Sequence, residues 1–204
     1  MQPDLFPTKE PITHQLTDGY IVETQGLFSP AESNSYFEQL AAIIPWSQSD
    51  IRIAGKLIPI PRLQCWIADP ALNYTYSGVS MVPEPWLEPV LEIKSIVERV
   101  SGFSFNSALA NYYRDGNDSV AWHSDDEPEL GLNPTVASVS FGAVRPFELK
   151  HKFRLDLAKI RLMVQGGSLL LMGGTIQNNW LHQIPKVRSL KEPRINLTFR
   201  RIIN

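Results

Sequence analysis

Residues 121–127 read Ala-Trp-His-Ser-Asp-Asp-Glu, and they decide how the rest of the chain is interpreted. On an extended strand, residues two apart point to the same face, so the side chains of His123 and Asp125 would leave the backbone together. An imidazole beside a carboxylate supplies two of the three protein ligands of a facial metal site. A His-x-Asp pair also occurs in exposed acidic turns, so the metal interpretation depends on what else the sequence contains.

The third ligand is expected to be His182, which follows Asp125 by 57 residues and lies in a short strand-like run, 180–184. Two histidines and one carboxylate leave three coordination positions open on one side of the metal, as in non-haem Fe(II) oxygenases. We therefore predict that His123, Asp125 and His182 bind Fe(II) and form a catalytic centre.

A second group of polar residues lies in the stretch 194–200, which reads Arg-Ile-Asn-Leu-Thr-Phe-Arg. The alternation predicts a strand with one apolar and one polar face. Many strands of this kind simply turn the polar face to water. Two guanidiniums, an amide and a hydroxyl in one row also suit a small dicarboxylate such as 2-oxoglutarate, the co-substrate that an Fe(II) oxygenase of this type needs. Because the row and the metal triad predict each other, we expect 2-oxoglutarate to bind Arg194, Asn196, Thr198 and Arg200.

The composition is that of an ordinary globular chain of 204 residues, which predicts a single domain over 1–204. No apolar run reaches membrane-spanning length and the N-terminus has no signal-peptide pattern, so no membrane association is expected. The single cysteine, Cys65, suits a reducing compartment and is expected to be a small buried residue. The protein is therefore expected to be intracellular, cytoplasmic or (in a eukaryotic source) nuclear, and to be a monomer.

The net charge of −2 conceals an uneven distribution. Residues 1–144 hold 7 Lys and Arg against 18 Asp and Glu, whereas residues 145–204 hold 12 against 3. A basic C-terminal part predicts binding to a polyanion such as nucleic acid, although strand faces can also segregate charge by accident. The best candidates for phosphate contacts are Lys150, Lys152 and Arg154, in a basic set that also contains Arg145, Lys159, Arg161, Lys186, Arg188 and Lys191.

The N-terminal part of the chain predicts an arm, two helices and a segment between them. Residues 1–20, with several prolines and an Asp-Gly pair, are expected to be an irregular arm. Ser29-Pro30-Ala31-Glu32 is a capping box, which predicts a helix to about Ile44. Residues 46–84 mix short strand-like runs with aromatic and basic residues, which fits either a small satellite sheet or a substrate-covering lid. A second helix is expected from Pro85-Trp86-Leu87 to Gly102.

The C-terminal part of the chain predicts short strands separated by turns. Such strands, with inward polar residues on two of them, indicate a double-sheet jelly roll with the site in its mouth. The expected fold class is α+β and mainly β: a double-stranded β-helix (jelly roll) over 105–204, braced by two or more helices. The strands are expected near 108–113, 119–123, 135–141, 146–151, 160–164, 168–172, 180–184 and 194–202.

Several of these segments carry a family resemblance. They are Asn111-Tyr112-Tyr113-Arg114-Asp115-Gly116, His123-Ser124-Asp125-Asp126-Glu127 and Ala137-Ser138-Val139-Ser140-Phe141-Gly142, together with His182 and the stretch 194–200. With them, the chain resembles the AlkB family of Fe(II)/2-oxoglutarate-dependent nucleic-acid dealkylases over roughly residues 50–204. Pro61-Arg62 and Tyr74-Thr75-Tyr76-Ser77-Gly78 are most similar to the branch that repairs duplex DNA.

The resemblance implies a jelly roll with an N-terminal nucleotide-recognition lid over residues 46–84. It also implies oxidative demethylation of bases such as 1-methyladenine and 3-methylcytosine in DNA. 2-Oxoglutarate and O2 would be consumed, and succinate, CO2 and formaldehyde would be released.

The same resemblance implies a role for each site residue. Iron would be held by His123, Asp125 and His182, and 2-oxoglutarate by the polar row together with Asn111 and Tyr113. Tyr76 would stack on a flipped base, while Asp126 and Glu127 would face a positively charged lesion. The residues implied to contact alkylated DNA are Arg62, Trp66, Tyr74, Tyr76, Asp126 and Glu127.

One stretch departs from the duplex-repair branch. Where that branch inserts a bulky aromatic wedge into the base stack, this chain has Ile53-Ala54-Gly55-Lys56, in which Ala54 offers little wedge. The preference between single and double strands therefore stays open. Three further alternatives remain: the same oxygenase acting on RNA, the same oxygenase acting on a protein side chain, or a non-enzymatic jelly-roll binding module whose arginine row binds another anion.

Overall fold

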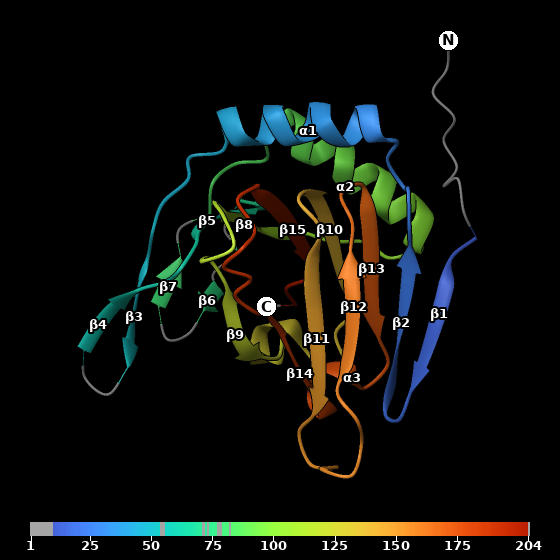
Figure 1. The fold of residues 1–204 in the computed structure, drawn as a ribbon. Coiled ribbons are helices and arrows are strands. Elements are labelled where there is room, and N and C mark those ends of the chain that lie inside the picture. The colour runs from blue at the N-terminus through green and yellow to red at the C-terminus, as the bar shows by residue number, and fades with distance from the viewer. Residues whose placement is uncertain are drawn as a thin grey trace.

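Two antiparallel sheets face each other in the computed structural model of the protein, which describes residues 10–53, 56–70, 72, 74–76, 79–81 and 83–203 (Figure 1). The larger sheet has seven strands: in spatial order β1 (Ile12–Leu16), β2 (Gly19–Thr24), β13 (Ser168–Gly173), β10 (Val136–Gly142), β15 (Arg194–Arg200), β8 (Ser107–Tyr113) and β5 (Leu63–Ala68). The smaller sheet has four: β12 (Ile160–Val164), β11 (Arg145–His151), β14 (Trp180–Ile184) and β9 (Val120–His123). This is the predicted double-stranded β-helix, and all eight predicted strands are present with ends shifted by at most two residues.

Two helices cover the outer face of the larger sheet (Figure 1). α1 (Pro30–Ile43) begins at the predicted capping box, in which the backbone N–H of Ser29 donates to Glu32 Oε2 at 2.8 Å. α2 (Glu88–Ser101) ends at Gly102, whose φ of 75° lies in the left-handed region that favours glycine. Two short elements complete the set, α3 (Ile176–Asn179) and the 3-10 turn η1 (Pro128–Leu130). Within the described ranges, no helix has the length and apolar character needed to cross a membrane.

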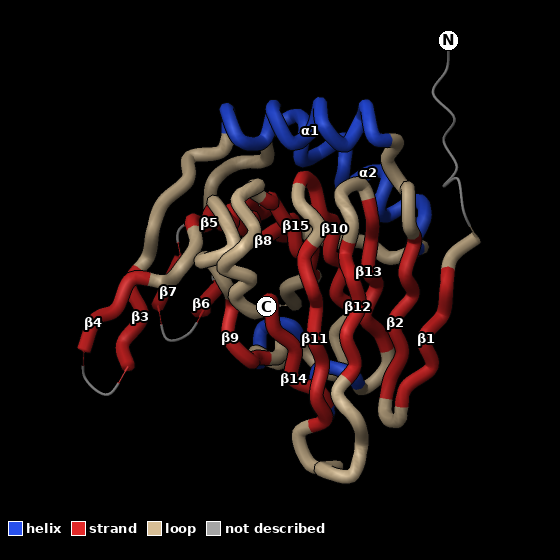
Figure 2. The backbone as a smooth tube through the Cα atoms, viewed as in Figure 1, coloured by secondary structure: helices blue, strands red, loops and turns tan. Residues whose placement is uncertain are grey.

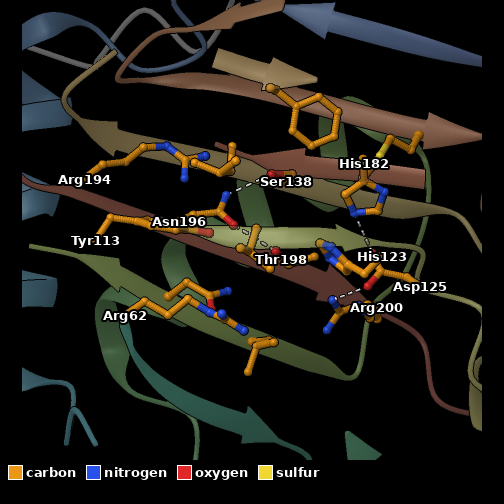
Figure 3. A pocket seen from close by; sticks show the side chains of 16 residues that line it. Arg62, Tyr113, His123, Asp125, Ser138, His182, Arg194, Asn196, Thr198 and Arg200 are labelled. Atoms are coloured by element: carbon orange, nitrogen blue, oxygen red, sulfur yellow. Dashed lines mark hydrogen bonds and ion pairs between the residues drawn. The ribbon is translucent and has the colours of Figure 1, made fainter. Parts of the chain in front are cut away.

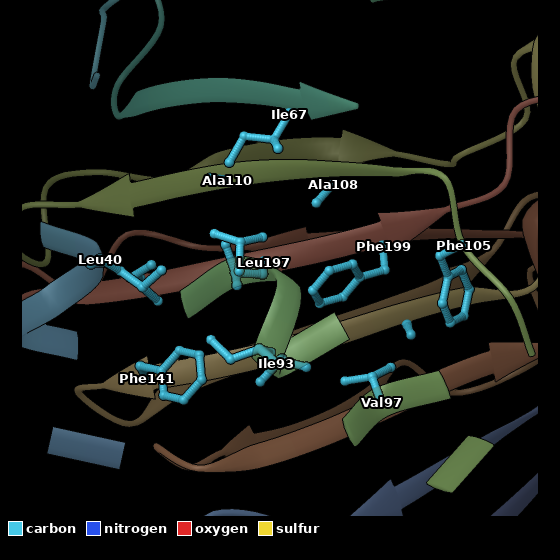
Figure 4. Close-up of a cluster of buried hydrophobic side chains, with 14 of the residues drawn as sticks. Leu40, Ile67, Ile93, Val97, Phe105, Ala108, Ala110, Phe141, Leu197 and Phe199 are labelled. Carbon is cyan, nitrogen blue, oxygen red and sulfur yellow. The ribbon is translucent and has the colours of Figure 1, made fainter. Parts of the chain in front are cut away.

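Strand β15 is buried on both faces. Its apolar residues, among them Leu197 and Phe199, pack on the helices together with Ile93 of α2 and Phe141 of β10 (Figure 4). All seven residues of the strand are buried, so the polar ones are enclosed between the sheets. The alternative in which the polar row faces water is therefore wrong for this strand.

The prediction of an irregular arm over residues 1–20 is wrong from residue 12 onward. Residues 12–16 and 19–24 form the β1–β2 hairpin, which extends the larger sheet through β13. The turn is made by Asp18 and Gly19, with φ of 60° and 147°. An Asp-Gly pair between β-branched and aromatic residues is a strong hairpin signal, because it supplies the positive φ values that tight hairpin turns need.

The predicted lid over residues 46–84 is only partly separate from the sheets. Residues 63–68 form β5, which pairs with β8 along its whole length. The rest contributes two hairpins, β3 (Asp50–Ile53) with β4 (Lys56–Pro59) and β6 (Tyr74–Tyr76) with β7 (Val79–Met81). Figure 2 shows these hairpins to one side of the two sheets. The near-continuous apolar run of β5 is explained by its burial, which a lid strand would not need.

Cys65 on β5 gives a simple test of this placement. Its side chain is 5% exposed, and burial, with a smaller effect of Glu84, raises the pKa of its thiol to about 12. Because the thiolate is the reactive form, we expect no reaction with a disulfide-forming thiol reagent in the native protein at about pH 8, and full reaction in denaturant. Rapid labelling of the native protein would place β5 at the surface.

Candidate active site

A cavity opens between the two sheets, and its wall contains most of the predicted site residues (Figure 3). Among the described residues that form the wall, Asp125 is the only carboxylate, whereas three side chains carry guanidiniums. The wall is formed by Arg62, Leu109, Asn111, Tyr113, Val120, His123, Asp125, Ser138, Phe147, Met172, His182, Ile184, Arg194, Asn196, Thr198 and Arg200.

The three predicted metal ligands come together. His123 ends β9 and pairs directly with His182 of β14, while Asp125 follows in the next segment of the chain. One ligand atom from each residue lies within 4.8 Å of the others, which suits a single metal ion. The three side chains converge on one end of the cavity in Figure 3.

Both imidazoles are held in the state that binds metals. His123 Nδ1 lies 2.8 Å from the carbonyl oxygen of Ala121, so Nδ1 carries the proton and Nε2 keeps its lone pair. The ring of His182 stacks on Phe147 at a centroid distance of 5.3 Å. Burial lowers the pKa of His123, and burial with the neighbouring His123 lowers the pKa of His182 to about 3. Both rings are therefore neutral near neutral pH.

Asp125 is fixed by a side-chain and a backbone contact. Arg200 Nη2 donates to Asp125 Oδ1 at 2.6 Å, and the backbone N–H of Asp125 donates to Gln177 Oε1 at 3.0 Å. Burial alone would raise the pKa of Asp125, but Arg200 and the two histidines outweigh it and lower that pKa. Asp125 Oδ2 makes no hydrogen bond to any described residue. An ionised carboxylate with one uncommitted oxygen fits a metal ion.

Arg194 is a buried cation without a carboxylate partner in the described part of the chain. It is 2% exposed, and Nη2 donates to Ser140 Oγ at 2.9 Å, while Nε and Nη1 make no hydrogen bond. Burial lowers the pKa of Arg194, which Tyr113 partly counteracts. An uncompensated buried charge is costly, and a bound carboxylate would provide both the missing acceptors and the counter-charge. The donor set therefore fits 2-oxoglutarate.

The rest of the polar row is tied together by hydrogen bonds. Asn196 Nδ2 donates to Ser138 Oγ and to the carbonyl oxygen of Val139, both at 2.8 Å. Thr198 Oγ1 donates to Asn196 Oδ1 at 2.9 Å. Both amide hydrogens of Asn196 are therefore used in hydrogen bonds within the protein, and they fix the side chains of the polar row. The hydroxyl oxygen of Thr198 still has lone pairs that can accept from a ligand.

Arg62 lies deeper than a lid residue would. It is 4% exposed, and its Nε donates to Asn111 Oδ1 at 2.7 Å. The structure therefore brings Arg62 together with a predicted 2-oxoglutarate residue in the cavity wall, just before β5.

Tyr113 is contacted by two guanidiniums, with Arg194 Cζ at 5.1 Å and Arg145 Cζ at 5.5 Å from its ring centroid. Arg145 is fully buried and donates to the carbonyl oxygens of Asp115, Asp118 and Pro185. Its inclusion among polyanion-binding residues was therefore wrong: a 0% exposed side chain that ties three loop carbonyls together has a structural role.

Of the residues implied to contact DNA, Arg62 lies in the cavity wall, whereas Trp66, Asp126 and Glu127 do not. Trp66 is 2% exposed on β5 and packs against Leu109, Leu130 and Ile202. Asp126 is exposed, and its carboxylate accepts from Lys152 Nζ at 2.8 Å. Glu127 comes immediately before η1 and, like Asp126, is absent from the cavity wall. Tyr74 and Tyr76 lie in β6, but their side chains, like residue Ala54, lie outside the described part of the structure.

Three residues of the site were not predicted. Ser138 and Ser140 support the polar row, and their alternation with apolar residues in β10 was a usable signal for a polar inner face. Gln177 of α3 is fully buried and holds the backbone of Asp125, yet nothing near it in the sequence indicates this role.

Comparison with known proteins connects this site to a family. The 2OG-Fe(II) oxygenase superfamily matches residues 21–200. The alpha-ketoglutarate-dependent dioxygenase alkB homolog 3 of Bos taurus is 42% identical over 185 residues, covering 87% of this chain and 64% of the relative. The DNA oxidative demethylase ALKBH2 of Mus musculus is 36% identical over 200 residues, covering 93% of this chain and 83% of the relative. The chain thus spans about 64% of the length of the alkB homolog 3 relative.

A solved structure described as "The structure of OsALKBH1" superposes with a TM-score of 0.67 at 18% identity, covering 92% of this chain and 100% of the other. At that identity the likeness concerns the fold alone.

The Arg200–Asp125 ion pair should control metal affinity. We expect Arg200→Gln to weaken binding of Mn(II), used as a redox-stable probe, by about 10- to 100-fold, because Asp125 loses its orienting partner. Arg194→Gln is the matched control, since Arg194 makes no contact with Asp125, and its Mn(II) affinity should stay near that of the wild type. Calorimetric titration measures both, and equal affinities for the wild type and Arg200→Gln would contradict the role of the pair.

Proposed function

The chain belongs to the 2OG-Fe(II) oxygenase superfamily, as a relative of the AlkB homologues, and we propose that it removes N-alkyl groups oxidatively from DNA bases. The proposed lesions are of the 1-methyladenine and 3-methylcytosine type. One observation carries the proposal: Arg194, buried without a carboxylate partner in the described residues, shares a cavity with His123, Asp125 and His182.

The three triad residues would hold Fe(II), and Arg194 would bind one carboxylate of 2-oxoglutarate. Bound Fe(II), with 2-oxoglutarate and O2, supplies the oxidising power that converts 2-oxoglutarate to succinate and CO2 and hydroxylates an N-methyl group, which then leaves as formaldehyde. The protein supplies orientation and protection from water.

The side chains around the site serve that orientation. Arg200 fixes the carboxylate of Asp125, and Arg62 fixes the amide of Asn111. The apolar wall residues Leu109 and Phe147 are buried and limit the entry of water. Because Asp125 is the only carboxylate of the described wall, a dianionic co-substrate meets an excess of positive charge there.

One comparison favours a nucleic-acid substrate, because some relatives are named DNA oxidative demethylases. A base of duplex DNA must leave its stack to reach the cavity, at a cost of about a few kcal/mol that is smaller for a damaged base. Action on DNA places the enzyme where DNA is kept: the cytoplasm of a prokaryote or the nucleus of a eukaryote.

Turnover on a defined lesion tests the proposal. Purified protein with Fe(II), 2-oxoglutarate and an oligodeoxynucleotide containing one 1-methyladenine should release succinate and formaldehyde in equal amounts and restore adenine. Single-stranded DNA, duplex DNA and RNA carrying the same lesion form the three arms. Succinate without formaldehyde in every arm would exclude demethylation of this lesion, and turnover confined to RNA would replace DNA as the substrate.

Arg194 should set the affinity for 2-oxoglutarate. Arg194→Lys keeps the charge but loses the forked geometry, and a lost charge-assisted hydrogen bond costs about 1.5–3 kcal/mol, or about tenfold or more in KM. Arg161→Lys, at an exposed arginine on the outer face, is the control and should leave KM unchanged. Steady-state succinate assays give both values, and an unchanged KM for Arg194→Lys would show that the dicarboxylate binds elsewhere.

A further inference from the structure

The end of β9 has side chains on both sides of the smaller sheet. His123 lines the cavity, whereas Trp122 is absent from the cavity wall and lies on the outer face beside Lys150 and Lys159. Two ammonium groups lie over its half-buried indole ring, Lys150 Nζ at 4.7 Å and Lys159 Nζ at 5.7 Å from the ring centroid. The face of an indole attracts cations, so Trp122 holds both ammonium groups close to its ring. Trp122 directly precedes His123, a candidate metal ligand.

The two lysines lie at the end of the β11–β12 ladder. The last pair of this ladder sets Leu149 opposite Ile160, and Lys150 and Lys159 are the residues next to that pair. Because both ammonium groups contact the same indole ring, two like charges are held close together there.

The other basic side chains of this region already have acidic partners. Lys152 pairs with Asp126 at 2.8 Å and Arg154 with Asp156 at 2.8 Å, while Arg161 lies 3.8 Å from Glu148. Two of the three residues predicted to contact phosphates, Lys152 and Arg154, are thus engaged within the protein. Lys150 and Lys159 have no ion pair with any residue in the described ranges, so their charges stay available to an external anion.

We propose that Trp122, Lys150 and Lys159, the β9 outer patch, bind the phosphate backbone of the nucleic-acid strand whose modified base enters the cavity. The identity of that strand rests on the proposed function. β9 is the edge strand of the smaller sheet, and the residue before it, Ser119, donates its N–H to the carbonyl oxygen of Pro61 at 2.8 Å. One short strand therefore joins the patch to the cavity wall.

A strand of nucleic acid that passes over the edge at β9 reaches the patch within a few residues of the cavity. Its phosphates carry the repeated negative charge that two adjacent ammonium groups without acidic partners would attract. The indole holds the ammonium groups in place and so reduces the side-chain freedom lost on binding.

Fluorescence anisotropy with an unmodified single-stranded DNA oligonucleotide, measured over a series of salt concentrations, tests the patch. The double variant K150Q/K159Q removes two charges and keeps most of both aliphatic stems. It should bind more weakly, and the slope of log affinity against log salt should fall by about 1.4, or about 0.7 for each lost phosphate contact. Its Tm should stay close to that of the wild type, because the relieved repulsion between the lysines offsets the two lost contacts with the indole.

A matched control separates the patch from net charge. K94Q/R99Q removes the same charge from α2, which covers the larger sheet and not the smaller one, and its affinity and salt slope should equal those of the wild type. Trp122→Leu should weaken binding, whereas Trp122→Phe should retain most of it.

Equal losses in the two double variants would reduce the effect to net charge and overturn the proposal. Unchanged binding by K150Q/K159Q would overturn the proposal as well, and would indicate that the patch binds a protein partner instead of nucleic acid. The assay uses unmodified DNA and no turnover, so either failure leaves the demethylation proposal standing. A failed demethylation assay, in turn, leaves the binding result measurable.

Discussion

The burial of two guanidiniums on one central strand is the constraint on which the rest of this structure depends. β15 has strands on both sides, helices against one face and the smaller sheet across the other, so Arg194 and Arg200 are 2% and 4% exposed. A cation in such a place needs an anion nearby. Arg200 has the carboxylate of Asp125, whereas Arg194 has the Ser140 hydroxyl and the ring of Tyr113 but no carboxylate in the described residues. A bound dicarboxylate would therefore supply the counter-charge and the hydrogen-bond acceptors that Arg194 lacks.

The metal triad follows from the same constraint. Arg200 keeps Asp125 ionised despite its burial, and Gln177 holds the backbone of Asp125 from the other side. His123 and His182 are paired on adjacent strands and kept neutral by burial, so they offer lone pairs without adding charge. One end of the cavity is thus prepared for a cation and the other for an anion. This is the distribution that Fe(II) and 2-oxoglutarate require.

Residue type and spacing could predict the parts of the site that lie on regular strands. The i,i+2 relation of His123 and Asp125 and the alternation of 194–200 depend only on strand geometry, which a sequence displays directly. The partner of each charged residue could not be predicted, because it depends on which elements meet in the folded protein. Arg145 was expected to bind a polyanion, yet it donates to loop carbonyl oxygens. Gln177 of α3 accepts from the backbone N–H of Asp125, although the two residues are far apart in the sequence. The hairpin over residues 12–24 was missed although its Asp-Gly turn was visible, since prolines nearby favoured an irregular arm.

The central claim is that Arg194 carries a buried charge that a dicarboxylate compensates. It can be tested without turnover, by thermal unfolding of the Mn(II)-loaded protein in the presence of 2-oxoglutarate or of 2-oxobutyrate, which keeps the metal-chelating keto acid but lacks the second carboxylate. A ligand that binds the native state raises Tm in proportion to its affinity. The structure predicts a clear rise in Tm with 2-oxoglutarate and a much smaller one with 2-oxobutyrate at the same concentration. Equal rises with both acids would contradict the claim, because the second carboxylate would then have no partner in the cavity.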